Sequence, residues 1–109
     1  MLLNKINTVA IALCAFLNTS SAAQLVDIVK HSTTTCTDGG GPTRTIYSGD
    51  CYTFYDTDYG VVLKNMPQGC TFVTYANKGC SGVTSHYGTD RLNQCLSLMG
   101  RWSMKVVNC

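Results

Sequence analysis

The chain has 109 residues, and only 13% of them are charged: eight Lys and Arg against six Asp and no Glu, a formal net charge of +2. The basic residues are scattered singly, whereas nucleic-acid-binding proteins normally carry a clustered basic face, so we expect no nucleic-acid partner. A chain this short forms one small domain at most, with a core that is marginal without cross-links.

Residues 1–23 have the order of a secretory signal peptide. Met1 to Lys5 carries one positive charge, residues 6–17 are mostly apolar, and small residues follow, with Ser21 and Ala23 at the −3 and −1 positions of a cleavage site. The alternatives are an amphipathic helix or a membrane anchor, but the apolar run is too short to cross a hydrocarbon core of roughly 30 Å. We therefore predict a secreted, extracellular protein with no stable membrane anchor and a single domain over residues 24–109.

Short segments rich in Val, Ile, Thr, Tyr and Phe recur through this domain, separated by Gly, Asp, Asn and Ser. In chain order they are Leu25–His31, Arg44–Tyr47, Cys51–Tyr55, Gly60–Lys64, Thr71–Tyr75, Thr84–Tyr87 and Ser103–Val107. Residues 91–99 contain enough Leu for one short helical turn, and helix signals are otherwise nearly absent. The pattern predicts an all-β domain of about eight short strands.

The cysteines indicate a disulfide framework. Of the seven, Cys14 lies in the signal segment, and an even number in a short secreted domain predicts three bridges. The six are Cys36, Cys51, Cys70, Cys80, Cys95 and Cys109. A zinc site would need cysteines two to four residues apart and a redox pair a C-x-x-C motif, and neither spacing is present. We expect no metal centre.

The domain also contains an internal repeat. A shift of 44 residues aligns two pairs of cysteines and two pairs of apolar strand segments. These are Cys36 with Cys80, Cys51 with Cys95, Ile28-Val29 with Phe72-Val73, and Tyr59–Leu63 with Ser103–Val107. Two copies of a four-strand unit could bury a common core that neither copy closes alone.

The second copy resembles a Greek-key motif of the βγ-crystallin family over Val61 to Cys109. Tyr75, six residues and then Gly82 match the aromatic-x6-Gly signature of that family, and Ser103 stands where the family places the serine that opens the fourth strand. The resemblance implies that the aromatic ring packs on a folded-over hairpin, that Gly82 adopts a backbone geometry closed to other residues, and that the serine hydroxyl ties the hairpin down. We therefore expect a two-motif Greek-key β-sandwich of βγ-crystallin type, stabilised by three disulfides.

In the first copy the same alignment places His31 at the aromatic position, Asp38 at the glycine and Tyr59 at the serine. The resemblance also implies a disulfide pairing. The first and fourth strands of a Greek key lie side by side and antiparallel, which favours Cys70–Cys109. The 44-residue offset favours one bridge within each copy, Cys36–Cys51 and Cys80–Cys95. A swapped arrangement, Cys36–Cys95 with Cys51–Cys80, respects the same symmetry and stays open.

Cation binding, which the family resemblance suggests, is not expected. Calcium-binding members carry an N/D-N/D-x-x-S/T-S clamp, whereas Arg101 stands in that region here. In the first copy Asp56 and Asp58 have no serine after them. Because hard-cation sites need several oxygen ligands, we predict no bound calcium and no cofactor.

Candidates for catalysis are few. His31 and His86 are the only general bases for neutral pH, and they fall on strands of different copies. A triad of Ser85, His86 and Asp90 has no loop to supply an oxyanion hole. We expect no catalytic residues and no enzyme activity.

For Trp102 beside Arg101 the favoured interpretation is packing against the core or hairpin, and the alternative is a surface anchor for a partner. The signal segment, six cysteines and the ending "SMKVVNC" also resemble small secreted cysteine-rich fungal proteins, among which killer toxins and antimicrobial proteins share the crystallin-type fold. The resemblance implies a monomeric, non-enzymatic effector or toxin-like protein that binds an unknown extracellular target on other cells. The alternatives are a structural extracellular protein without toxicity and a small secreted hydrolase.

Overall fold

The computed structural model describes residues 22–109. The predicted signal peptide and Cys14 fall almost wholly on residues 1–21, outside the described residues. The prediction of an all-β domain is confirmed. The eight strands are β1 (Leu25–His31), β2 (Arg44–Tyr47), β3 (Tyr52–Thr53), β4 (Gly60–Asn65), β5 (Thr71–Asn77), β6 (Ser81–Tyr87), β7 (Cys95–Ser97) and β8 (Ser103–Val107).

The segment 91–99 differs from the prediction of one helical turn. A short 3-10 helix, η1 (Thr89–Arg91), precedes it, and the strand β7 occupies its centre. Leu96 is buried there because β7 pairs with β4, and the alternation around it is that of an edge strand with one face in the core. The buried Leu96 of this segment therefore belongs to a sheet and not to a helix.

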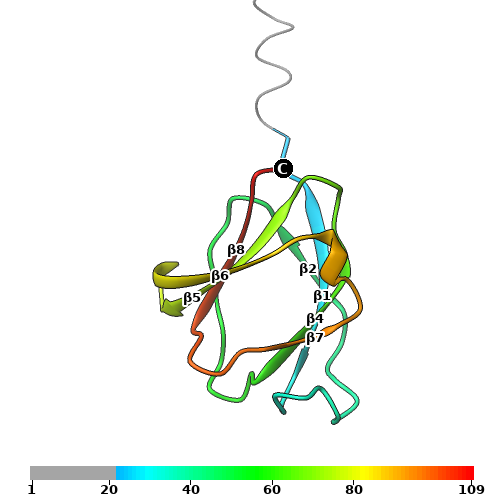
Figure 1. Cartoon of the computed structure of the whole chain (residues 1–109), viewed down its shortest axis with the longest axis vertical. Helices are drawn as coiled ribbons and strands as arrows, with labels where there is room; N and C mark the ends of the chain where they lie inside the picture. Colours follow the sequence, from blue (N-terminus) through cyan, green and yellow to red (C-terminus); the bar gives the residue numbers. More distant parts are fainter. Residues whose placement is uncertain (1–21) are drawn as a thin grey trace, which may run out of the picture.

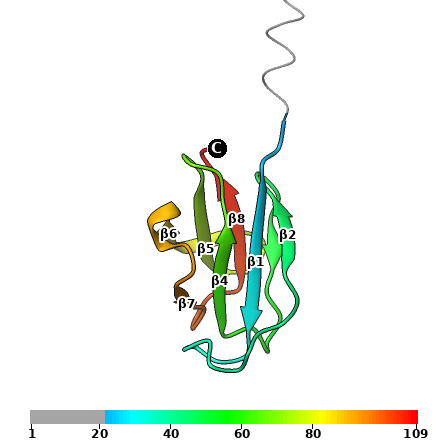
Figure 2. The ribbon, with the colours of Figure 1, turned by 90° about the vertical axis from the view of Figure 1, so that its right-hand side faces the viewer.

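The strands form two antiparallel sheets of four, in the orders β2-β1-β4-β7 and β3-β8-β5-β6. Each sheet contains the first, second and fourth strands of one half of the chain and the third strand of the other half. Figure 1 shows the labelled strands of the two sheets on opposite sides of the view, and Figure 2 shows β1 beginning at the end of the molecule where the C-terminus lies. Neither half can therefore complete its own sheet.

The core lies between the sheets and is filled by alternate residues of the central strands. Val26 and Ile28 from β1 face Phe72 from β5, and all are at most 1% exposed. The same cluster contains Ile46, Phe54, Val61, Leu63, Met66, Cys70, Leu96, Leu98, Met104 and Val106. This burial is the main favourable contribution to folding, and it requires both halves.

The internal repeat is visible in the strand pairing, with one correction to its alignment. In the first half His31 pairs with Gly60, and in the second half Tyr75 pairs with Ser103. The residue equivalent to Ser103 is therefore Gly60, and the prediction of Tyr59 was wrong by one position. The cause is a connection between third and fourth strands that is one residue shorter in the second half, so the offset changes from 44 to 43.

Equivalent loops share equivalent backbone conformations. The amide of Gly49 donates to Val106 O, and the amide of Asn93 donates to Leu63 O, both at 2.8 Å. Gly49 and Asn93 both have positive φ, 88° and 61°. Asn tolerates this left-handed region better than most side chains, so the two halves keep one loop design with different residues.

The predicted bridge between Cys70 and Cys109 is present, with a Cα–Cα distance of 4.1 Å. Cys70 directly precedes β5 and Cys109 follows β8, and these strands are antiparallel neighbours. This pairing therefore follows from strand order alone.

The favoured pairs Cys36–Cys51 and Cys80–Cys95 were wrong, and the swapped arrangement is present: Cys36–Cys95 and Cys51–Cys80, with Cα–Cα distances of 5.8 and 6.0 Å. The reason is the exchange of the third strands. Cys51 precedes β3, which lies in the sheet of β5 and β6, whereas Cys95 opens β7 in the sheet of β1. Each hairpin cysteine thus meets the third strand of the other half.

Over residues 22–109, no helix is long and apolar enough to cross a membrane.

Candidate binding surface

Two equivalent connections meet at one end of the sandwich, and they contain the predicted surface residue Trp102. One connection joins β3 to β4 and the other joins β7 to β8. Because the third strands are exchanged, the connections cross: Phe54 N donates to Trp102 O and Leu98 N donates to Tyr59 O, both at 2.9 Å. Tyr59 and Trp102 are therefore equivalent residues, each directly before its fourth strand, brought side by side by the fold.

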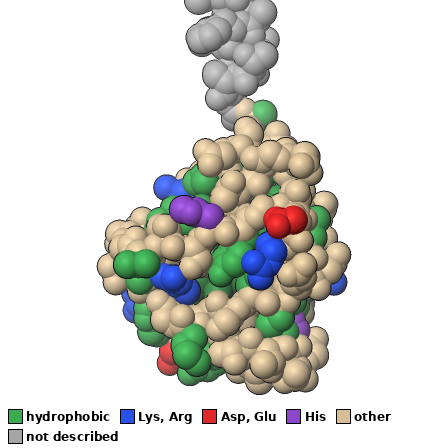
Figure 3. Space-filling model, in the orientation of Figure 1, with side chains coloured by type: hydrophobic (Ala, Val, Ile, Leu, Met, Phe, Trp, Pro, Cys, Tyr) green, Lys and Arg blue, Asp and Glu red, His purple; other side chains and the backbone are tan. Residues whose placement is uncertain are grey.

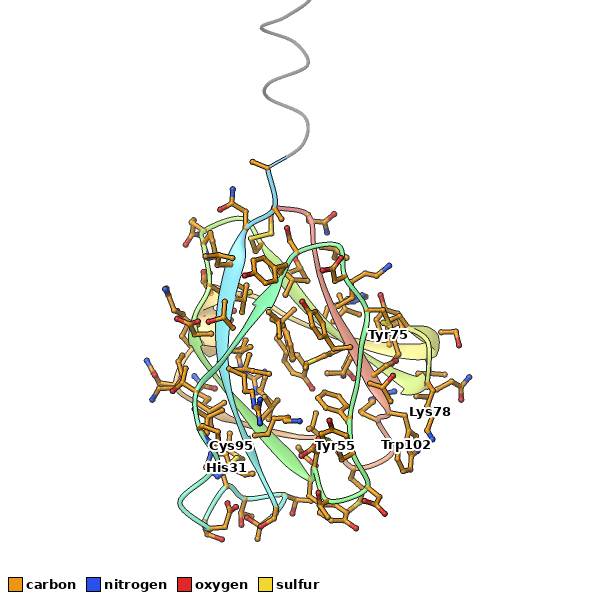
Figure 4. All side chains as sticks on the ribbon, turned by 180° about the vertical axis from the view of Figure 1, so that it is seen from behind. His31, Tyr55, Tyr75, Lys78, Cys95 and Trp102 are labelled. Carbon is orange, nitrogen blue, oxygen red and sulfur yellow. A yellow bond between two sulfur atoms is a disulfide. The ribbon has the colours of Figure 1, made fainter. Side chains whose placement is uncertain are left out.

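Four large apolar side chains are exposed around these connections, and we call them the aromatic end: Tyr55 (69% exposed), Tyr59 (47%), Met99 (73%) and Trp102 (38%). They line a shallow cavity of about 170 Å³ together with Asp56, Asp58, Leu98, Gly100 and Arg101. In Figure 4 Tyr55, Trp102 and Lys78 lie toward the same side of this end, apart from His31. Contiguous exposed apolar side chains of this kind mark interaction surfaces more often than isolated ones do.

A cation and a carboxylate hold Tyr55 in place. Lys30 Nζ lies 4.5 Å from the centre of the Tyr55 ring and donates to Asp58 Oδ2 at 3.0 Å. The same carboxylate oxygen accepts a hydrogen bond from Tyr55 N at 2.8 Å. Only 10% of the Asp58 side chain is exposed. The ring is thus positioned from one side while most of its surface stays open to solvent.

The second loop is fastened in a different way. Lys78 Nζ lies 5.3 Å from the centre of the Trp102 ring. Arg101 donates from Nη1 to Val83 O at 2.9 Å and from Nη2 to Ser85 Oγ at 2.7 Å. Trp102 is therefore exposed in part, with Lys78 of the hairpin against its ring, whereas the Arg101 guanidinium is engaged with β6 at the border of the cavity.

The predicted tie between Ser103 and the hairpin is present. Ser103 is fully buried, its hydroxyl accepts from Cys80 N at 2.9 Å, and it donates to Asn77 O at 2.5 Å. Gly82 has φ +89°, and a Cβ there would lie 2.6 Å from Asn77 Nδ2. Tyr75, half-buried, accepts from the Trp102 amide at 2.8 Å. These residues set the hairpin against the start of β8, and so set the position of Trp102.

The first half closes its hairpin without a serine. At Gly60 an added Cβ would overlap Thr33 O and lie 2.9 Å from Cys36 Sγ. The hairpin backbone and its disulfide thus occupy the space that the serine side chain fills in the second half. In the first half the disulfide and Gly60 fasten the hairpin against the fourth strand, and in the second half the Ser103 hydroxyl does so.

His31 and Asp38 form a pair that sequence reasoning did not anticipate. His31 is buried, and its Nδ1 lies 2.6 Å from Asp38 Oδ1. The pKa of Asp38 lies far below its ordinary value, mainly because its carboxylate accepts a hydrogen bond from the backbone N–H of Ser32. Hydrogen bonds with His31 and the Ser32 hydroxyl lower the pKa further, and desolvation opposes them. Asp38 does not have the positive φ of Gly82; in this hairpin Gly39 (+85°) and Gly40 (+78°) do, and Gly40 packs against the His31 ring.

The residues considered for catalysis do not converge. His31 lies on β1 in one sheet and His86 on β6 in the other. The Ser85 hydroxyl accepts a hydrogen bond from Arg101. Within residues 22–109 there is no group of three or more His, Cys, Asp or Glu side chains placed to hold a metal ion.

Comparisons with protein-family models, with curated proteins and with solved structures find no match. Sequence reasoning singled out Trp102 and Arg101 but missed Tyr55, Tyr59 and Met99. A signal for Tyr59 existed in the internal repeat, because it is equivalent to Trp102, but the fixed offset of 44 concealed that correspondence by one residue.

Proposed function

We propose that this protein is an exported, monomeric domain of crystallin type that acts on other cells by binding and not by catalysis. The order of the strands, with the third strand of each half in the sheet of the other, supports the crystallin-type assignment. So does the serine tie at Ser103 with its partner glycine, Gly82. Three disulfides are the usual means by which a small extracellular domain compensates for a limited core, and they support export.

The aromatic end carries the proposal that the protein acts by binding. Tyr, Trp and Met side chains are enriched in recognition surfaces, and Tyr and Trp supply large contact areas at low cost in side-chain entropy. Here they stand on two loops whose backbones are hydrogen-bonded to each other and to β1 and β5. A surface whose loops are held in place in this way is preorganised for binding.

The distribution of charge supports a target that is not a nucleic acid. On the face drawn in Figure 3, Lys and Arg side chains are separated from one another rather than gathered into one patch. At the aromatic end itself, Lys30 is paired with Asp58. Binding through this end would therefore depend on apolar contact and hydrogen bonds more than on phosphate attraction.

Binding of the labelled protein, purified with its disulfides formed, to intact cells tests the proposal. We expect saturable binding that falls at least tenfold in Tyr59→Ala and is unchanged in Tyr47→Ala. Tyr47 is a matched control, since it is a strand tyrosine of nearly equal exposure (48% against 47%) that does not line the cavity. Equal binding by both variants would contradict the proposal. Growth and cell-death assays with the same samples separate a toxin-like effector from a structural extracellular protein.

A further inference from the structure

The cavity at the aromatic end combines flat apolar walls with fixed hydrogen-bond acceptors. We propose that it binds one ring of a neutral oligosaccharide of gluco configuration, with adjoining rings lying along the exposed aromatic side chains. The inference rests on the proposed function, whose ligand class it names. Pyranose rings with equatorial hydroxyls present an apolar face of C–H groups and a polar rim, and the cavity offers a complement to each.

The walls match the apolar face of such a ring. Tyr55, Tyr59 and Trp102 border the cavity, whose volume is about 170 Å³, and offer flat apolar faces to such a ring. Tyr59 and Trp102 occupy equivalent positions on two crossing loops and approach the cavity from both halves. Because Lys30 already holds the Tyr55 ring from one side, binding would cost little further side-chain entropy at that ring.

The acceptors match the rim of hydroxyl groups. Asp58 Oδ2 accepts the hydrogen bonds from Lys30 Nζ and Tyr55 N, and among the described residues Oδ1 accepts none. An ionised carboxylate has about four lone-pair sites, so Oδ1 keeps capacity to accept from a sugar hydroxyl. Asp56, which is exposed, lines the same cavity. Carboxylate–hydroxyl bonds are charge-assisted and are stronger than neutral ones.

The charges disfavour an anionic lipid surface. Two carboxylates, Asp56 and Asp58, line the cavity and would be repelled by acidic headgroups. Two of the nearby cations are engaged, since Lys30 binds Asp58 and the Arg101 guanidinium binds β6, and the third, Lys78, lies 5.3 Å from the centre of the Trp102 ring. A neutral ligand rich in hydroxyl groups meets neither repulsion nor a need to break these bonds.

The chain's single tryptophan, Trp102, lies in the cavity wall, so its fluorescence reports on this site directly. We would titrate the full disulfide-bonded protein with cellohexaose and with chitohexaose and expect a saturable change in emission with at least one of them. Affinity should fall at least tenfold in Tyr59→Ala and in Asp58→Asn, and stay within twofold in Tyr47→Ala. Melting curves and calorimetric titration of each variant separate lost binding from lost folding.

Failure of both sugars to bind overturns the inference, and if cells still bind through Tyr59 the proposed function stands without it. Binding to vesicles of phosphatidylcholine and phosphatidylglycerol that requires Tyr59, with no sugar binding, overturns it in favour of a lipid surface. Self-association in sedimentation that Tyr59→Ala abolishes, again without sugar binding, overturns it in favour of a second copy. Sugar binding that is equal in Tyr59→Ala and wild type places the ligand elsewhere and also overturns it.

Discussion

Replacing Ser103 by Ala tests whether one buried hydroxyl fastens the second hairpin. The hydroxyl bridges Cys80 N and Asn77 O, and its removal leaves a donor and an acceptor without their partner. An unsatisfied buried polar group costs about 1–3 kcal/mol. Two groups lose their partner, which sets the loss at about 2–6 kcal/mol. Because the carbonyl retains a second lone pair and both groups are only partly buried, we expect the lower part of this range, a fall in the free energy of unfolding of about 2–3 kcal/mol.

For a domain of this size the loss corresponds to a melting temperature lower by about 10–20 °C. Chemical and thermal unfolding with the disulfides intact measure it, and amide exchange at Cys80 gives a local measure, since that amide should exchange faster in the variant. Ser81→Ala in the same hairpin is the control: its exposed hydroxyl makes one long bond, 3.4 Å, to Lys78 O. Equal losses in the two variants, or an unchanged Cys80 amide, would refute the reasoning.

The remaining predictions concern the first half and its disulfide to the second. Gly60→Ser, which restores the serine found in the second half, should destabilise the protein in thermal melts, because its Cβ would overlap Thr33 O; a raised melting temperature would contradict this packing. Because the pKa of Asp38 is lowered in the folded state, its contribution to stability is present above the ordinary carboxyl pKa of about 3.9 and is lost as pH falls below it. Unfolding of wild type and Asp38→Asn should therefore differ near neutral pH and converge in acid. Replacing Cys36 and Cys95 together by Ala should lower the free energy of unfolding by about 4 kcal/mol, because their bridge closes a 59-residue separation. Peptide mapping of the native protein should recover the Cys36–Cys95 linkage and not Cys36–Cys51.

Local signals in the sequence were sufficient to predict most strands. Short segments rich in β-branched and aromatic residues, separated by turn residues, predicted β1, β4 and β8. The roles of Ser103 and Gly82 were predicted from the resemblance to the βγ-crystallin signature: the positive φ of Gly82 is a local property, whereas the Ser103 hydroxyl reaches Cys80 N, 23 residues away in the sequence. β7 was missed because three residues are too few for a pattern to show.

The linkage of the remaining four cysteines could not be decided from the residues alone. Two pairings respect the internal symmetry, and they differ only in which sheet receives each third strand, a contact between segments far apart in sequence. β3 has two residues and carries almost no sequence signal for its partner. The aromatic end was concealed for a related reason: its walls come from two loops of unequal length, and their adjacency arises from the same exchange of strands.

The exchange of third strands also affects how long the protein would persist among proteases. The connection between β4 and β5 joins the two halves, and a cut there would leave both fragments linked through Cys36–Cys95 and Cys51–Cys80. Each fragment would also keep a strand hydrogen-bonded inside the other's sheet. A nicked molecule would therefore hold its two crossing loops together and retain an intact aromatic end, so that a single cleavage between the halves would not inactivate it.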